Sequence, residues 1–192
     1  MGGRRFLPDA VRLSPEALAE LEALGIRPGE DRGRLAPLGL GPVGGRAHVP
    51  KKAISSPDVL NEAYDYAKPS SFSRGVRVEL AGTTLLLLSG TASVDENGCT
   101  VHAGDFHAQC LRTLRNLTRL LVSEGASWHD VVRTTCYLRD IERDYDAFNE
   151  IRTLFLDHAG VDPLPASTAI QARICRSDLL VEIEAIAILP RE

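Results

Sequence analysis

The sequence feature that most constrains the fold is a continuous apolar stretch, residues 179–189, that contains two carboxylates. It reads LLVEIEAIAIL, without glycine or proline, which is typical of a buried strand. Because successive side chains of a strand point to opposite faces, Glu182 and Glu184 share one face, on the order of 6–7 Å apart. The opposite face is wholly apolar and suits a core: Val181, Ile183, Ala185, Ala187 and Leu189.

The two glutamates are flanked on their own face by apolar residues, namely Leu180, Ile186 and Ile188. A charged group on such a face must be paired, protonated or placed in a cleft, because burial without compensation is costly. An apolar setting and a like charge nearby both raise a carboxyl pKa toward neutrality, where acid–base catalysis is efficient. We therefore expect Glu182 to be a catalytic acid or base and Glu184 to lie in the same site.

The remaining pattern predicts an α+β fold. Expected strands cover residues 76–80, 84–89, 131–138, 167–174 and 180–189, and expected helices cover residues 105–125 and 144–160. The order β-β-α-β-α-β-β predicts a sandwich in which two helices pack on one face of a single mixed sheet.

The chain divides into an extension and a domain. Residues 1–65 are expected to form an N-terminal extension, with a short helix at 14–25 that begins at Ser14-Pro15 and a Gly/Pro-rich connector after it. Residues 66–192 are expected to form the α+β domain.

The last two strands are joined by a short connection, residues 175–179, so an antiparallel hairpin is the default expectation. In the strand 167–174, alternation assigns Thr168, Ile170, Ala172 and Ile174 to the core. Matching the apolar faces then sets Arg173 opposite Glu182, or opposite Glu184 with Cys175 opposite Glu182. Either register predicts that Arg173, Cys175 and both glutamates meet on the sheet face away from the helices. A cross-strand ion pair at a subunit interface is the simpler interpretation of Arg173 and Glu184.

The apolar residues beside the glutamates predict an oligomer interface on that face. The formal net charge of −4 gives no basic field for nucleic acid, and no apolar run reaches membrane length. The four cysteines are far apart and the five histidines are scattered, so we expect free thiols in a cytoplasmic protein and no metal or other cofactor.

Several stretches, taken together and in order, resemble the RidA (YjgF) superfamily. They lie within residues 69–189 and are Ser89-Gly90, residues 104–109 and 114–117, residues 130–135, Phe148-Asn149-Glu150, residues 165–168 and residues 181–187. The resemblance implies a chorismate-mutase-like fold and a homotrimer with cofactor-free ligand clefts between its subunits. In family deaminases these clefts hydrolyse enamine or imine carboxylates such as 2-aminoacrylate. The first glutamate of the Glu-Ile-Glu strand, here Glu182, positions the water or moves the proton.

The chain departs from the family at the residue that holds the substrate carboxylate. Family deaminases use an arginine in a Pro-Ala-Arg-Ser segment as a bidentate clamp, whereas this chain has Ala166 at that position. The aromatic residue of the family's Pro-Tyr-Ser segment is Phe72, which lacks the hydroxyl. Arg173 and Arg74 are candidates for the missing clamp. The resemblance thus implies a deaminase that acts on an altered substrate.

A narrower resemblance, over residues 89–93 and 174–185, is to the C-terminal half of the chorismatases. These enzymes cleave or rearrange the enol-pyruvyl ether of chorismate with a glutamate at the Glu182 position, and in some a cysteine at the Cys175 position shapes the outcome. Residues 1–65 cannot replace the other half, so the alternative is a single-domain hydrolase or lyase for a cyclic enol ether or aromatic-precursor acid. Thr91, Ala92 and Ser93 are candidate substrate-binding residues, although a structural role in the turn fits Thr91 and Ser93 equally well.

Two interpretations without deamination remain. The trimer could bind a small acid without turnover, which the missing arginine would tolerate. Ribonuclease activity has also been assigned in the superfamily, but the net charge of −4 and the lack of an aromatic-basic surface argue against it. The expected partners are therefore a second copy of the chain and a small carboxylate.

Overall fold

The computed structural model describes residues 14, 15, 19, 49–66 and 69–190. It divides the chain into two compact units, Met1–His48 and Val49–Glu192. The predicted helix at 14–25 lies almost wholly outside the described residues. The division falls earlier than the predicted boundary after residue 65, because residues 49–65 belong to the sheet unit. Ile54 and Leu60 are buried in its core.

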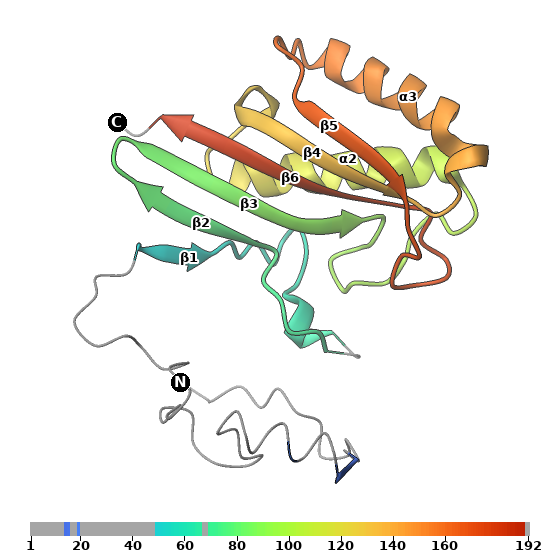
Figure 1. Ribbon diagram of the computed structural model, residues 1–192, viewed down its shortest axis with the longest axis horizontal. Helices are drawn as coiled ribbons and strands as arrows, with labels where there is room; N and C mark the ends of the chain where they lie inside the picture. Colours follow the sequence, from blue (N-terminus) through green and yellow to red (C-terminus); the bar gives the residue numbers. More distant parts are fainter. Residues whose placement is uncertain (1–13, 16–18, 20–48, 67–68, 191–192) are drawn as a thin grey trace. The chain divides into compact units, whose positions relative to one another are not determined.

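The second unit is a six-stranded mixed sheet with the order β1-β2-β3-β6-β4-β5. The strands are β1 (Lys51–Ala53), β2 (Gly75–Leu80), β3 (Thr83–Ala92), β4 (Val131–Leu138), β5 (Ala166–Gln171) and β6 (Val181–Pro190). The helices are α2 (Phe106–Ser123) and α3 (Ile141–His158), with short 3-10 helices η1 (Ala63–Asp65) and η2 (Trp128–Asp130). Figure 1 shows α2 and α3 on one side of the sheet. This is the predicted α+β architecture with one added strand, β1, which pairs antiparallel with β2.

Strand β6 lies in the middle of the sheet, antiparallel to both β3 and β4. Its predicted alternation is confirmed, since Val181, Ile183, Ala185 and Ala187 are buried at 0–2% exposure against the helices. Glu182 and Glu184 lie on the opposite, helix-free face and are partly exposed. The two faces of β6 thus separate the core from the polar residues.

The predicted hairpin of the last two strands is wrong. Strand β5 pairs in parallel with β4, and β4 stands between β5 and β6. The physical reason is that α3 carries the chain back along the sheet after β4, which makes β4 and β5 parallel neighbours. The connection after β5 then passes β4 to reach the central position beside β3.

The predicted faces of β5 are also reversed. The register pairs Thr134 with Ser167 and Cys136 with Ala169, so Ser167 and Ala169 face the helices. Thr168 and Ile170 lie on the helix-free face, where Ile170 is 42% exposed. The alternation of the sequence could not show which set of alternate residues in β5 faces the helices, because this edge strand of short, mixed residues has no strongly apolar side.

Both helices begin at a capping aspartate. Asp105 accepts a hydrogen bond from the Ala108 amide, as expected, and α2 buries the predicted stripe that includes Cys110 and Leu117. The second helix begins three residues before the predicted start at Asp144, because Asp140 accepts from the Arg143 amide and caps it. Asp144 is instead a buried residue paired with Arg143 at 2.6 Å.

Two side chains hold the segment that leads into β6. Gln109 of α2 is fully buried, donates to the Asp178 carbonyl at 2.8 Å and accepts from the Leu180 amide at 2.8 Å. Arg139, just after β4, donates to the carbonyls of Ile174, Arg176 and Leu179. These bonds fix where β6 begins and therefore which residues Glu182 faces.

Replacing Gln109 with Leu should lower the free energy of unfolding by about 1–3 kcal/mol, because the partly buried backbone groups of Asp178 and Leu180 lose their partners. Urea denaturation measures this difference. Arg115→Met, an exposed change on the same helix, is the control and should stay within about 0.5 kcal/mol of the wild type. Equal stability of Gln109→Leu and the wild type would show that Gln109 does not anchor this segment.

Candidate functional site

The candidate site is centred on Glu182 in the middle of β6. Its register partners are Ala92 of β3 on one side and Tyr137 of β4 on the other. The carboxylate lies directly over the backbone of Gly90, since a Cβ placed there would stand 2.0 Å from Glu182 Oε1. Gly90 is therefore the residue that makes room for this carboxylate.

A bulge in β3 creates that room. Leu88 pairs with Ala185 and Thr91 pairs with Ile183, so two residues, Ser89 and Gly90, lie where β6 has only Glu184. The bulge is tied to the segment before β2, because the Ser89 hydroxyl donates to the Ser73 carbonyl at 2.8 Å. The resemblance included Ser89-Gly90, but the bulge depends on pairing with β6 and was not predicted.

The electrostatics of the site match the expectation for Glu182. Burial raises the pKa of this carboxyl above its ordinary value, and the neighbouring Glu184 carboxylate raises it further. Tyr137 lies on β4 opposite Glu182, and Glu184 is close enough to act on its hydroxyl. Burial and the nearby charge of Glu184 raise the pKa of Tyr137. The arrangement holds a carboxyl that stays protonated to higher pH than an exposed glutamate.

Tyr137 was missed by the sequence reasoning. It lies in a correctly predicted strand, but only the order of the strands shows that β4, and not β5, is the neighbour of β6. Once β4 is that neighbour, the register places Tyr137 opposite Glu182 and Thr135 opposite Glu184.

Ala166, the position of the family's clamping arginine, lies at the start of β5 on the helix-free face. Its parallel partner on β4 is Arg133. The exposed Arg133 guanidinium donates to the Thr168 hydroxyl at 3.2 Å, so it extends across β5 beside Ala166. This arginine was also missed, because the predicted hairpin gave β5 a different neighbour.

Arg74 and Phe72 lie together beside the bulge. The Arg74 guanidinium is 4% exposed and lies over the rings of Tyr66 and Phe72, at 4.7 and 5.3 Å from their centroids. Its Nε donates to the Asn61 carbonyl at 2.9 Å, and burial lowers its pKa. Phe72 is 42% exposed. Arg74 is thus enclosed by protein in the single chain.

The residues after the bulge divide between the two faces. Thr91 and Ser93 are buried at 2% and 0% exposure, and their hydroxyls donate to the carbonyls of Ser89 and Val101. Ala92 lies opposite Glu182. Both hydroxyls therefore serve the local backbone, as the structural interpretation of this stretch expected.

Arg173 and Cys175 are not brought to the glutamates within the chain. Both are exposed and lie in the connection between β5 and β6, so neither takes part in strand pairing with β6. Within the described residues, no ion pair joins Arg173 to Glu182 or Glu184. The expected convergence was argued from the hairpin pairing of β5 with β6, which the structure does not contain. Cys175 is a free thiol.

In the described part of the chain, no group of three or more His, Cys, Asp or Glu side chains is arranged to hold a metal ion. Among the same residues, no helix has the length and apolar character needed to cross a membrane. The raised pKa of Glu182 gives the described site a group suited to proton transfer.

Replacing Glu182 with Gln should stabilise the protein at pH 7, and the gain should vanish as the pH falls toward 4. A raised pKa in the folded state means that the ionised carboxylate costs folding free energy. That cost is fully present above the folded-state pKa and absent below the unfolded value of about 4.3. Urea denaturation at both pH values measures the difference. Glu150→Gln, which removes an exposed carboxylate of α3, controls for net charge. A gain that grows on acidification would contradict the raised pKa.

Comparisons with known proteins cover most of the sheet unit. Residues 66–189 match the family model described as Endoribonuclease L-PSP. A RutC family protein of Synechocystis sp. is 31% identical over 112 residues, which are 58% of this chain and 83% of that protein. The 3-aminoacrylate deaminase RutC of Acinetobacter baylyi is 31% identical over 103 residues, 54% of this chain and 78% of that protein. The YjgF gene product of E. coli is 24% identical and has the same fold, with a TM-score of 0.56 over 73% of this chain and 99% of that one. The chain therefore belongs to the RidA (YjgF) family.

Proposed function

We propose that the protein hydrolyses a small enamine or imine carboxylate, with Glu182 as the acid–base residue. The observation that carries the proposal is the position of Glu182, held over Gly90 in a setting that raises its pKa. A relative named 3-aminoacrylate deaminase supports the substrate class. Such a reaction needs a group that gives and takes a proton near neutral pH.

In this reaction Glu182, in its protonated form, gives a proton to the β-carbon of the enamine and produces a protonated imine. The resulting carboxylate takes a proton from water as the water oxygen bonds to the imine carbon. The proton of the new hydroxyl then moves to the amino nitrogen as the C–N bond breaks, so that ammonia leaves and a carbonyl remains. The net change is substrate plus water to an oxo acid plus ammonia, and Glu182 returns to its starting state.

Arg133 is our candidate for the substrate's carboxylate in place of the arginine absent at Ala166. It lies on the same sheet face as the glutamates and beside Ala166. Within one chain, however, its partner on β6 is Ile186, four residues from Glu182 and so about 13 Å along the strand. A substrate with only a few heavy atoms cannot span that separation.

In an oligomer, Arg133 of one subunit can lie next to Glu182 of the neighbouring subunit, and the separation within one chain then no longer matters. The helix-free face carries exposed large hydrophobic residues, with Leu87 at 40% and Ile188 at 43% exposure. Such a surface favours burial against another copy. We therefore propose a homotrimer with the reaction at each cleft between subunits.

Mixing two impaired variants, assayed at a substrate concentration well below the KM of Arg133→Met, tests both the chemistry and the shared cleft. Glu182→Gln should lower kcat about 100-fold or more, the usual range for an acid–base residue. Arg133→Met should raise KM by about 10- to 100-fold, through loss of a charged hydrogen-bonding partner. Ammonia release from freshly generated 2-aminoacrylate and from 3-aminoacrylate is the assay. After unfolding and joint refolding, the mixture should regain a fraction of wild-type activity, because some clefts then combine two intact residues.

Glu150→Gln mixed with Arg133→Met is the matched control, and it should regain activity whether or not the clefts are shared. If the mixture of Glu182→Gln and Arg133→Met regains no activity, then either one subunit supplies both residues to each cleft or Arg133 is not part of the site. No acceleration by the wild type over buffer would overturn the deaminase proposal. Turnover of chorismate would then favour the enol-ether alternative, and tight binding of a small acid without turnover would favour the binding trimer.

A further inference from the structure

A cavity lies on the side of the sheet opposite to Glu182, between α3 and strands β4, β5 and β6. Its volume is about 170 Å³. Most of its wall is apolar and comes from Trp128, Phe148, Leu156, Leu164 and Ile183. Leu164 is 63% exposed, so the cavity is open to solvent beside the segment that leads into β5. The glutamates point away from it, because Ile183 of this wall faces the opposite side of β6.

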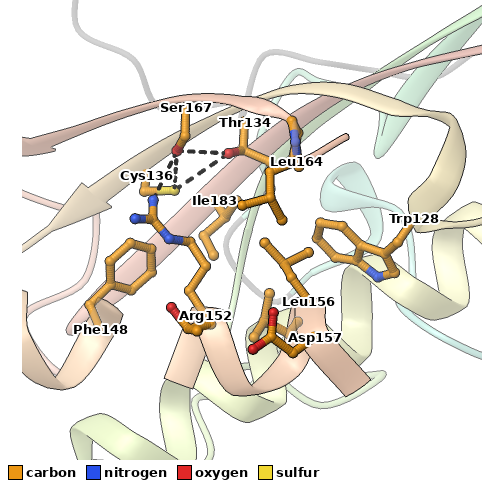
Figure 2. A pocket seen from close by; sticks show the side chains of 13 residues that line it. Trp128, Thr134, Cys136, Phe148, Arg152, Leu156, Asp157, Leu164, Ser167 and Ile183 are labelled. Atoms are coloured by element: carbon orange, nitrogen blue, oxygen red, sulfur yellow. Dashed lines mark hydrogen bonds between the residues drawn. The ribbon is translucent and has the colours of Figure 1, made fainter. Parts of the chain in front are cut away.

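One end of the cavity is polar and contains a cation. Figure 2 shows Arg152 of α3 extending toward Ser167, Thr134 and Cys136 on the sheet. The Arg152 Nη1 donates to Ser167 Oγ at 3.1 Å, and Thr134 Oγ1 donates to the same oxygen at 3.0 Å. The Cys136 sulfur lies 3.9 Å from each of these two hydroxyl oxygens. Arg152 is thus held by the Ser167 hydroxyl at the end of an apolar cavity.

The positive charge of Arg152 is not neutralised within the described residues. Its other contacts are a hydrogen bond from Nη2 to Asn149 Oδ1 at 2.6 Å and stacking over the Phe148 ring, 5.1 Å from the centroid. No carboxylate in the described part of the chain lies within ion-pair distance of it. Asp157 also lines the cavity but lies one turn further along α3. Burial raises the pKa of the Cys136 thiol, so this neighbour adds no negative charge.

We propose that this cavity binds a small monocarboxylate with a compact apolar body, such as one six-membered ring. The carboxylate pairs with Arg152 and Ser167, and the ring lies among Trp128, Phe148 and Leu156. The size agrees, since a cavity of about 150 Å³ in another protein accommodates benzene. The positive charge of Arg152 determines the class of ligand. An apolar amine does not fit, because its ammonium group would lie next to the guanidinium. This site does not depend on the proposed deaminase activity, which uses the opposite face of the sheet.

Trp128 makes the cavity directly observable, because it is the single tryptophan of the chain. Titration with cyclohexanecarboxylate, which does not absorb where tryptophan is excited, should change the Trp128 fluorescence in a saturable way. Arg152→Met should weaken binding at least about tenfold, as expected for loss of a charged partner. Ser167→Ala should weaken it by a smaller factor. Cyclohexanemethanol, the neutral analogue, should bind weakly and equally to the wild type and Arg152→Met.

Glu182→Gln separates the two faces of the sheet. It should leave the Trp128 titration unchanged, because Glu182 does not line the cavity. Absence of saturable binding in the wild type would overturn the proposal. So would equal affinity of the wild type, Arg152→Met and Ser167→Ala, or a response abolished by Glu182→Gln. Thermal unfolding shows whether each variant is folded. If Arg152→Met is not folded, the comparison of Ser167→Ala with the wild type tests the proposal.

Discussion

The structure depends on the two-residue period of one central strand. Strand β6 lies between β3 and β4, and its buried positions complete the core against α2 and α3. The intervening positions carry Glu182 and Glu184 onto the face without helices. A shift of one residue would bury both carboxylates and expose the core residues, so the pairing register is strongly determined. The bonds from Gln109 and Arg139 to the segment before β6 reinforce that register.

Local patterns predicted most of the fold, and the failures share one cause. The alternation of β6, the stripe of α2 and the α+β order follow from the residues of each element. Strand neighbours are decided by the crossover through α3, which the short connection 175–179 does not reveal. The wrong neighbour for β6 misplaced Arg173 and Cys175 and concealed Tyr137 and Arg133. The raised pKa of Glu182 was predicted because that argument needed only the residue's own strand.

The two faces of the sheet use charge differently. On the helix-free face, two carboxylates lie close together beside Tyr137, and the result is a proton held more tightly than usual. On the helix side, the guanidinium of Arg152 lies at the end of an apolar cavity, where it donates hydrogen bonds to one hydroxyl and one amide oxygen and stacks over the Phe148 ring. The first arrangement suits the movement of a proton, and the second suits the retention of an anion.

Because Glu182 lies against Gly90, the residue at position 90 also indicates where the acid can lie in related sequences. A methyl group there would occupy the space of a Glu182 oxygen, so the bulge and the acid form one geometric unit. In a related sequence with a glutamate at the position of Glu182, glycine at the position of 90 is compatible with the acid lying over the bulge. A larger residue there requires the acid to adopt another rotamer and to face other neighbours. Two positions 92 residues apart in the numbering can therefore be checked together when the chemistry of a relative is assigned.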